Sequence, residues 1–321
     1  MNNPVQKSAK ATLFAAVLAV ATVVAALVPP TAARALNVPR PLVDVDWLDA
    51  NRDDVVVIDV RKDPATFTKT GHIPGARVVQ SKALRMTREL YGAKYAKMRP
   101  TRAHFQALMR DLGVNRDSAV VLTNRGEKAS QVVHATLLYW QLKYFGFDNV
   151  AILDGGNAAW EAALMDMSDE PMGPVAAGDF VAAEPRENLV ATLTDVEETV
   201  TYGGPQLVDT RELNYYLGLK KKSYVDAAGH IPNAVVLPYA FLTADEGPAF
   251  FRPPMEQVEL ARYMGLKPRD SMIVYCNSGN LATANWFVMH ELVGNMDVRL
   301  YDGSMLQWTQ NGKHVVTRHI N

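Results

Sequence analysis

Residues 272–283 of the chain have the sequence MIVYCNSGNLAT. The four apolar or aromatic residues at 272–275 predict a buried strand of a parallel sheet. Cys276, the only cysteine among the 321 residues of the sequence, follows this strand directly. Small and polar residues come next, with Gly279 as the flexible point, and residues 282–292 then predict a helix. A strand, a tight loop and a helix in this order form a cradle in which backbone amides and the helix dipole bind an anion.

The position of Cys276 predicts a reactive thiol. A thiol in such a loop should ionise more easily than a free thiol, because the local field stabilises the thiolate. The stretch therefore indicates a thiolate with an anion bound beside it. The alternative is a small buried hydrophobic residue, which is the usual role of a lone cysteine at the end of a strand.

The bulk composition excludes several classes of function. A length of 321 residues suggests two domains of ordinary size. The formal net charge of −1 gives no general attraction to nucleic acid or to an anionic membrane, so we expect neither as a partner. With one cysteine and no Cys/His cluster, the sequence predicts no internal disulfide, no metal and no cofactor. The sequence does not indicate an oligomeric state.

The amino end predicts export from the cytoplasm. Lys7 and Lys10 precede an uncharged apolar run over residues 11–28, and the sequence ARA at 33–35 fits a cleavage site. We therefore expect a signal peptide over residues 1–35 and a periplasmic location for the rest of the chain. Because the apolar run is also just long enough to span a bilayer, an uncleaved membrane anchor is the alternative.

The chain carries one series of motifs twice, in the same order. The matched pairs are DVR at 59–61 and DTR at 209–211, GHIPGA at 71–76 and GHIPNA at 229–234, SAVVLTNRG at 118–126 and SMIVYCNSG at 271–279, and LDG at 153–155 and YDG at 301–303. Such self-similarity predicts duplicated domains. We place them at residues 37–167, the first half, and 188–321, the second half, joined by a Pro- and Gly-rich linker at 168–187. Strands that alternate with helices predict, in each half, a parallel sheet with helices on both faces.

The two halves differ at the position of the thiol. When the halves are overlaid, Thr123 stands where Cys276 stands in the second half. We therefore expect the second half to be catalytic, and the first half to be scaffold, a wall of the substrate site, or both. The basic stretch at residues 81–102 is expected to be an ordinary solvated face.

Taken together, the paired motifs and Cys276 in its C-x-x-G loop resemble the two-domain rhodaneses, the thiosulfate and 3-mercaptopyruvate sulfurtransferases. The resemblance covers about residues 42–316. It implies an α/β fold of two tandem rhodanese-like domains. It also implies an enzyme in which Cys276 takes sulfur from a small anionic donor as a persulfide and passes it to a thiol or to cyanide.

The loop after Cys276 supplies most of the candidate site. Its backbone amides are expected to hold the anionic persulfide, as an oxyanion hole holds an oxyanion. The residues that contribute them are Asn277, Ser278, Gly279, Asn280, Leu281 and Ala282. Arg211 is a further candidate because strand ends of an open α/β sheet line its crevice, and Thr283 is expected to support the loop. The resemblance to mercaptopyruvate-type enzymes implies that His72 works with Ser278, and the alternative for His72 is a structural role in its turn.

Two departures from the family pattern leave the donor open. The loop carries no Lys or Arg between Cys276 and Thr283, although thiosulfate-type loops are commonly basic. Where the family has a substrate-binding Arg four residues after the second Asp-x-Arg motif, this chain has Tyr215. The cations that could replace that Arg are Lys220, Lys221, Lys222 and Arg252.

The remaining alternatives concern the class of function. The donor is either thiosulfate-like or 3-mercaptopyruvate, and Cys276 could also act only as a non-enzymatic sulfur carrier. A cysteine phosphatase is disfavoured, because those loops place an Arg six residues after the cysteine, where this chain has Ala282.

Overall fold

A computed structural model describes Met1 and residues 36–317 of the protein. The cleavage site predicted at residues 33–35 and the apolar run before it lie outside the described residues. Within the described part, no helix is both long enough and apolar enough to cross a membrane.

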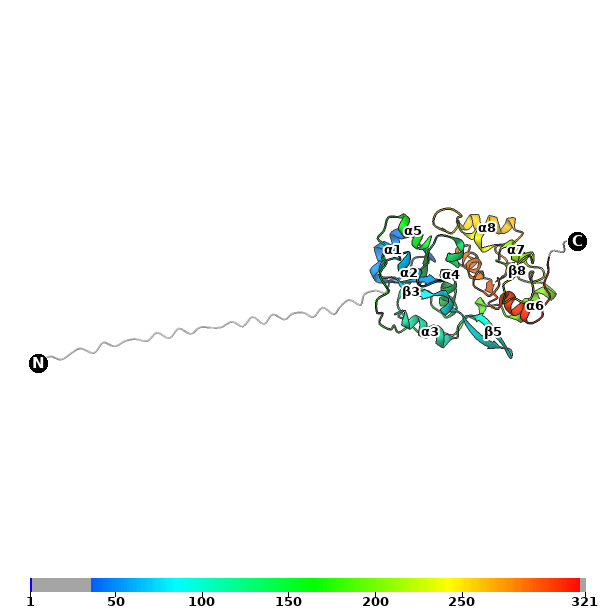
Figure 1. Cartoon of the computed structure of the whole chain (residues 1–321), viewed down its shortest axis with the longest axis horizontal. Helices are drawn as coiled ribbons and strands as arrows, with labels where there is room; N and C mark the ends of the chain where they lie inside the picture. The colour runs from blue at the N-terminus through cyan, green and yellow to red at the C-terminus, as the bar shows by residue number, and fades with distance from the viewer. Residues whose placement is uncertain (2–35, 318–321) are drawn as a thin grey trace. The chain divides into compact units, whose positions relative to one another are not determined.

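A five-stranded parallel sheet forms the centre of the first half (Figure 1). Its strands lie side by side in the order β1, β7, β6, β2, β3. Their bounds are Leu42–Val43 for β1, Val55–Arg61 for β2, Arg77–Gln80 for β3, Ala119–Thr123 for β6 and Val150–Leu153 for β7. The helices of this half are α1 Val45–Asn51, α2 Thr66–Lys69, α3 Arg102–Asp111, α4 Ala129–Tyr144 and α5 Gly156–Ala162.

The second half repeats this plan with a four-stranded parallel sheet. The order β11, β10, β8, β9 matches β7, β6, β2, β3 of the first half. The strands are β8 Gln206–Asp209, β9 Val235–Val236, β10 Met272–Tyr275 and β11 Val298–Leu300. The helices are α6 Leu193–Tyr202, α7 Leu213–Tyr216, α8 Pro254–Tyr263, α9 Ala282–Trp286 and α10 Ser304–Gln310. The helix predicted over 282–292 begins at the expected residue and continues past α9 as a turn of π-helix over Phe287–Leu292.

Each sheet is buried on both faces, which explains its continuous apolar strands. Val120 and Leu122 of β6 pack into one core, whereas Val121 packs into a separate core on the other face. In β10, Val274 and Ile273 are divided in the same way. The predicted fold class, two tandem α/β domains with helices on both faces of a parallel sheet, is confirmed.

The two halves share one apolar core. Helix α4 is apolar on nearly all sides and packs against α9 of the second half. The Tyr139 ring meets the Phe287 ring edge-on at 4.8 Å between centroids, and the hydroxyl groups of Thr136 and Thr283 lie 2.9 Å apart. Burial of such a helix stabilises both halves together, because hydrophobic stabilisation scales with the apolar area removed from water.

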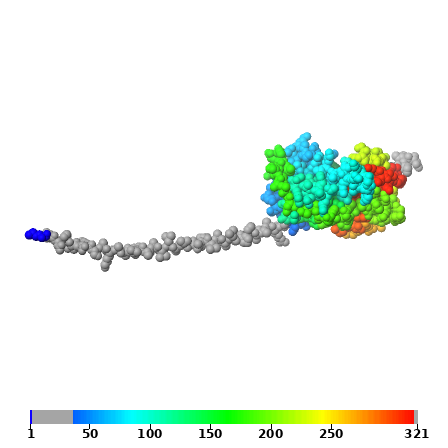
Figure 2. All heavy atoms as spheres, turned by 90° about the horizontal axis from the view of Figure 1, so that it is seen from below, coloured from blue at the N-terminus to red at the C-terminus, as the bar shows by residue number. Residues whose placement is uncertain are grey.

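A β-hairpin has no counterpart in the second half as the structure describes it. Its strands are β4 Met86–Leu90 and β5 Ala93–Met98. The hairpin reaches the second half, where Tyr95 packs against Leu306 of α10 (Figures 1 and 2). Figure 2 shows its cyan atoms next to the red atoms near the carboxyl end. The basic stretch predicted to be solvated is therefore, in part, an interface between the halves.

The paired Asp-x-Arg motifs form buried ion pairs. A charge that is buried at the end of a strand needs such a partner, because an uncompensated buried charge is strongly destabilising. Arg61 bonds Asp59 at 2.7 Å, and Arg211 bonds Asp209 at 2.6 Å. Each guanidinium also donates to the carbonyl oxygen of the glycine that opens the Gly-His-Ile-Pro turn, Gly71 or Gly229. These bonds fix the turn to the end of the central strand in both halves.

Candidate active site

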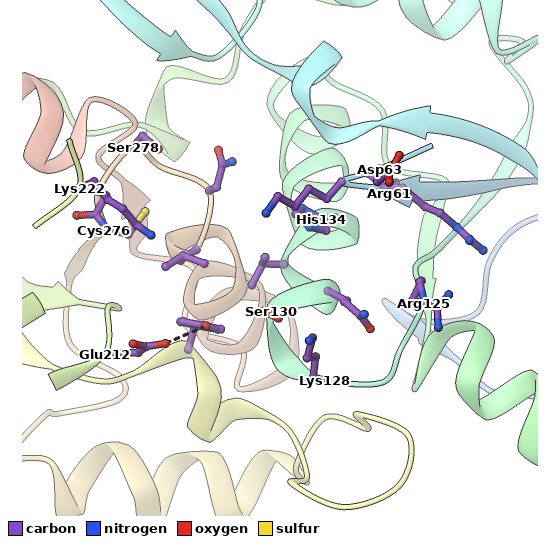
Figure 3. A pocket seen from close by; sticks show the side chains of 18 of the residues that line it. Arg61, Asp63, Arg125, Lys128, Ser130, His134, Glu212, Lys222, Cys276 and Ser278 are labelled. Atoms are coloured by element: carbon purple, nitrogen blue, oxygen red, sulfur yellow. Dashed lines mark hydrogen bonds between the residues drawn. The ribbon is translucent and has the colours of Figure 1, made fainter. Parts of the chain in front are cut away.

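A cavity of about 600 Å³ lies between the two halves, at the carboxyl ends of β2 and β10. This is the position where open α/β sheets bind their ligands. Figure 3 shows Cys276, Ser278 and Lys222 on one side of it and Arg61, His134 and Arg125 on the other. The lining residues are Val60, Arg61, Lys62, Asp63, Thr66, Arg125, Lys128, Ser130, Gln131, Val133, His134, Glu212, Tyr215, Lys222, Tyr224, Tyr239, Cys276, Asn277, Ser278, Asn280 and Leu281.

Cys276 lies at the floor of this cavity. It follows the last residue of β10, and only 1% of its surface is exposed. Its backbone amide donates to the hydroxyl oxygen of Ser304 at 3.1 Å, and its carbonyl oxygen accepts from Met305. Hydrogen bonds therefore fix the backbone of Cys276, and a substrate would reach its thiol from the cavity.

The loop of residues 276–282, the Cys276 loop, presents a set of unused backbone donors. The amides of five of its residues donate no hydrogen bond to any residue that the structure describes. These residues are Asn277, Ser278, Asn280, Leu281 and Ala282. Buried or partly buried amides without a partner are rare in proteins unless a ligand or water completes them. The loop can therefore surround an anion next to Cys276, as the sequence predicts.

One peptide group of this loop is fixed from both sides. The carbonyl oxygen of Ser278 accepts a hydrogen bond from the Arg85 guanidinium, and the amide of Gly279 donates to Ser304 Oγ at 3.0 Å. Gly279 has a φ of +80°, and a Cβ there would lie 2.7 Å from Asp302 Oδ1. Glycine is thus required both by the left-handed backbone and by the close approach of Asp302.

Asp302 connects this loop to the first half of the chain. Its carboxylate is fully buried and accepts from the Arg85 guanidinium at 2.7 Å and from the Arg99 amide at 2.8 Å. Burial acts to raise the pKa of Asp302, but the positive charges of Arg85 and Arg99 outweigh it and hold that pKa below its ordinary value. The prediction that residues 81–102 form a solvated face is wrong for Arg85 and Arg99, because they neutralise a buried carboxylate.

The positive charge of the cavity comes from outside the Cys276 loop. Lys222 and Tyr215 both line the wall on the Cys276 side, and the Lys222 ammonium lies 5.2 Å from the centre of the Tyr215 ring. Of the four cations considered as replacements for the family Arg, Lys222 is the one that lines the cavity. Arg252 lies elsewhere, next to Asp245 and Glu256.

Helix α4 contributes His134, which sequence reasoning missed. Burial lowers the pKa of His134 to about 4, with the nearby Lys62 ammonium acting in the same direction, so the ring is neutral at pH 7. Its Nδ1 is buried without a hydrogen-bond partner in the described structure. Ser130 lines the cavity one helical turn earlier. The spacing of Ser130 and His134 places both on one helix face, but the sequence does not show which face meets the cavity.

The structure places the other candidates around the loop, outside the cavity lining. Arg211 is buried and donates to Asn277 Oδ1 at 3.3 Å, so it supports the loop from behind. The Thr283 hydroxyl donates to the carbonyl oxygen of Asn280 at 2.7 Å. Gly279 and Ala282 shape the backbone without lining the cavity.

His72 does not reach Ser278. Its ring stacks on Phe67 at 3.5 Å, and its Nδ1 lies 3.0 Å from the carbonyl oxygen of the same residue. His72 lines a different cavity, beneath residues 168–178. His230 stacks on Tyr216 in the same manner in the second half, so both turn histidines hold local structure. The histidine that lines the Cys276 cavity is His134.

The match to a family model agrees with this geometry. The model described as the rhodanese-like domain matches the chain twice, at residues 44–163 and 192–311. The chain belongs to the rhodanese family. The first match contains every strand of the first sheet except β1, and the second contains the whole second sheet together with Cys276 and its loop.

The chain is similar to named sulfurtransferases and shares its fold with a third protein. The thiosulfate sulfurtransferase of Corynebacterium glutamicum is 30% identical over 282 residues, which cover 84% of this chain and 88% of that protein. The crystal structure of SseA from Escherichia coli, described as a 3-mercaptopyruvate sulfotransferase, is 26% identical with a TM-score of 0.69, and the match covers 83% of this chain and 98% of SseA. An anaerobic ergothioneine biosynthesis enzyme from Chlorobium limicola has a TM-score of 0.76 at 20% identity, covering 88% of this chain and 71% of that enzyme.

These relatives show what kind of enzyme the chain is. The likeness to the Chlorobium protein shows a shared fold alone. Membership of the rhodanese family and similarity to named sulfurtransferases make this chain a sulfurtransferase.

Proposed function

We propose that Cys276 carries the transferred sulfur as a persulfide. The thiolate attacks the outer sulfur of an anionic donor, a bond forms between Sγ and that sulfur, and the donor's own bond to it breaks. With thiosulfate, sulfite leaves with the electron pair. The terminal sulfur of the persulfide then carries the negative charge until an acceptor removes it.

The observation that carries this proposal is the set of unused amides around Cys276. Five N–H groups of the loop have no acceptor in the described structure, and preorganised donors of this kind stabilise an anion without reorganisation. Cys276 is also the only thiol in the sequence, so no second cysteine of the chain could discharge the persulfide as a disulfide. Burial of the thiol at the cavity floor protects the bound sulfur from solvent.

We propose an anionic donor of the thiosulfate type. Five cationic side chains line the cavity, but Arg61 is paired with Asp59 and Arg125 with Glu127. The other three, Lys62, Lys128 and Lys222, stand against the two lining carboxylates Asp63 and Glu212. Such a surplus attracts a small anion into the cleft. The relative from Corynebacterium is named as a thiosulfate sulfurtransferase, which supports the same donor.

A second candidate donor is 3-mercaptopyruvate. Ser278, which matches the serine of mercaptopyruvate-type loops, lines the cavity, and the loop lacks the basic residues typical of thiosulfate-type loops. The similarity to SseA favours this donor, whereas the position of His72 away from Ser278 disfavours the Ser–His arrangement implied by the resemblance. Both donors are anionic and end in a transferable sulfur.

Mass spectrometry of the intact protein after exposure to each donor tests the proposal. We expect one added sulfur atom on the wild type and none on Cys276→Ser, whereas Thr123→Ala should still accept sulfur. The donor that loads the protein faster is the better substrate. Loading followed by turnover with cyanide distinguishes an enzyme from a carrier that only holds sulfur. If Cys276→Ser still gained a sulfur atom, the proposal would fail.

We propose that the enzyme works in the periplasm. The charged residues Lys7 and Lys10, the apolar run and the ARA sequence at 33–35 support a cleaved signal peptide. Amino-terminal sequencing of protein recovered from a periplasmic extract should start at Leu36. Recovery of the intact amino end in the membrane fraction would instead support the uncleaved anchor.

A further inference from the structure

We infer that the first-half wall of the Cys276 cavity, formed by Lys62, Arg125, Lys128, Ser130 and His134, binds the carboxylates of an organic thiol that accepts the sulfur. The inference rests on the sulfur transfer proposed above and adds the class of the acceptor. It assigns to the half without a cysteine a binding role in the second step of the reaction.

The cavity is larger than a small donor such as thiosulfate requires. A volume of about 600 Å³ lies within the range of cavities that enclose drug-sized molecules, about 300–1,000 Å³. Thiosulfate, a five-atom ion, needs only the end next to Cys276. The remainder of the cavity can accommodate an organic thiol whose sulfur lies toward Cys276 and whose carboxylates lie toward the opposite wall (Figure 3).

The charges of this wall suit carboxylates. Lys62 and Lys128 form no ion pair with any described residue, whereas Arg125 pairs with Glu127. Asp63 is the one carboxylate that lines this wall, and its Oδ1 already accepts from the Ala65 amide. Two ammonium groups without partners therefore face the cavity together with one guanidinium, and such a set favours a ligand with more than one negative charge.

The polar groups of helix α4 complete the wall. His134 is neutral at pH 7, so one of its ring nitrogens can donate a hydrogen bond and the other can accept one. Its Nδ1 is buried and has no partner among the described residues. When this nitrogen carries the proton, it can donate a hydrogen bond to a ligand carboxylate.

The chemistry of the second step requires no further reactant. The acceptor thiolate, with its proton already lost to solvent, attacks the outer sulfur of the Cys276 persulfide. A new S–S bond forms on the acceptor, the bond from Sγ to the outer sulfur breaks, and the electron pair stays on Sγ as a thiolate. The products are an organic persulfide and the resting enzyme.

A single-turnover experiment tests the role of the wall. The protein is loaded with sulfur from thiosulfate, freed of donor, and mixed with mercaptosuccinate, which has two carboxylates, or with 2-mercaptoethanol, which has none. The rate at which sulfur leaves the intact protein is followed by mass spectrometry. We expect the ratio of the two rates to fall about tenfold in Lys62→Met/Lys128→Met relative to the wild type, the effect of two partly exposed ion pairs.

The matched control removes two charges elsewhere on the first half. Lys69 and Lys82 are exposed and do not line the cavity, so Lys69→Met/Lys82→Met should keep the wild-type ratio. An unchanged ratio in the Lys62/Lys128 variant, or an equal fall in both double variants, would overturn the inference.

A direct binding measurement separates this inference from the proposed function. Mercaptosuccinate is titrated calorimetrically into Cys276→Ser protein with and without the two Lys62 and Lys128 substitutions, and we expect about tenfold weaker binding with them. Equal affinity of the two proteins for mercaptosuccinate would refute the binding role of this wall, even if sulfur transfer were established. If Cys276 gained no sulfur from any donor, the proposed function would fail while this titration still reported on the wall.

Discussion

Arg85 and Asp302, which are 217 residues apart in the sequence, form a buried ion pair with 2.7 Å between Nη1 and Oδ1. The same guanidinium bonds the carbonyl oxygen of Ser278, two residues after Cys276. The first half of the chain therefore fixes the backbone that surrounds the thiol of the second half. The position of the Cys276 loop depends on contacts between the halves as well as on its own sequence.

Replacement of Arg85 should impair both stability and turnover. Arg85→Met leaves the buried Asp302 with Arg99 as its remaining cation, which we expect to cost about 3 kcal/mol in the free energy of unfolding. Because the Ser278 carbonyl loses its donor, we expect kcat to fall about tenfold to hundredfold. Urea unfolding and steady-state kinetics measure the two effects.

Two further variants test whether the bonds of the Arg85 guanidinium cause these losses of stability and kcat. Arg85→Lys should recover stability better than kcat, because one ammonium group cannot bond Asp302 and Ser278 with the geometry of a guanidinium. Lys82→Met, three residues earlier and exposed, should change neither quantity. A normal kcat in Arg85→Met would show that the loop keeps its shape without this contact.

Gly279→Ala should inactivate the enzyme by crowding the loop. The new Cβ would lie 2.7 Å from Asp302 Oδ1 and 3.0 Å from the Arg85 guanidinium. Gly294 is a matched control, because its φ of +79° differs by only one degree from the +80° of Gly279 and a Cβ there would meet no atom within 4 Å. Both variants should lose about 1 kcal/mol through backbone strain, but only Gly279→Ala should lose most of its kcat/KM. Equal activities would contradict the role assigned to the close approach.

The repeated motifs predicted the fold because they act locally. The Asp59 and Asp209 carboxylates bond an Arg two residues away, and the apolar strands need only neighbours of the same kind, so both features are visible in the sequence. Cys276 and its loop were predicted for the same reason. His134, Lys62 and Arg85 were missed as site residues because their places depend on how two distant halves pack. The sequence left His72 between a site role and a structural role, because its motif specifies a turn but does not specify the direction of its ring.

Lys222→Met should weaken donor binding. Lys222 lines the cavity on the side of Cys276, next to Tyr215, which occupies the position of the family Arg. Its charge can therefore replace that of the Arg and attract the donor anion. We expect the KM for thiosulfate to rise about fivefold, as for a partly exposed charge pair, with a smaller change in kcat. Lys220→Met provides the control, because Lys220 is exposed and outside the cavity lining. An equal rise in KM for both variants would indicate a general effect of net charge.

Asp154→Asn should stabilise the protein at neutral pH. Burial raises the pKa of Asp154 to about 6, although the amides of Phe251 and Gly155 oppose this by donating to the carboxylate. The folded protein binds this proton more tightly than the unfolded chain, so the cost in stability grows as the pH rises from 3.8 and is complete above about 6. Asn cannot ionise, and its oxygen can still accept from Phe251.

The pH dependence gives this prediction its test. We expect Asp154→Asn to gain about 1–2 kcal/mol at pH 7.5. The gain should shrink as the pH falls from about 6 toward the ordinary pKa of 3.8, and it should vanish only below that value, where both states of the wild type carry the proton. Urea unfolding at a series of pH values measures it. A gain that did not change with pH would exclude ionisation of Asp154 as the cause.

The shared core of α4 and α9 bears on the ancestry of the molecule. A gene truncated at the linker would encode a carboxyl-terminal fragment in which the apolar surface of α9 is exposed to water. Its buried Asp302 would also lack both counterions. The half without a cysteine therefore cannot be deleted without exposing the apolar core and the buried carboxylate that it shares with the Cys276 half. Selection for a stable second half is then enough to retain the first half.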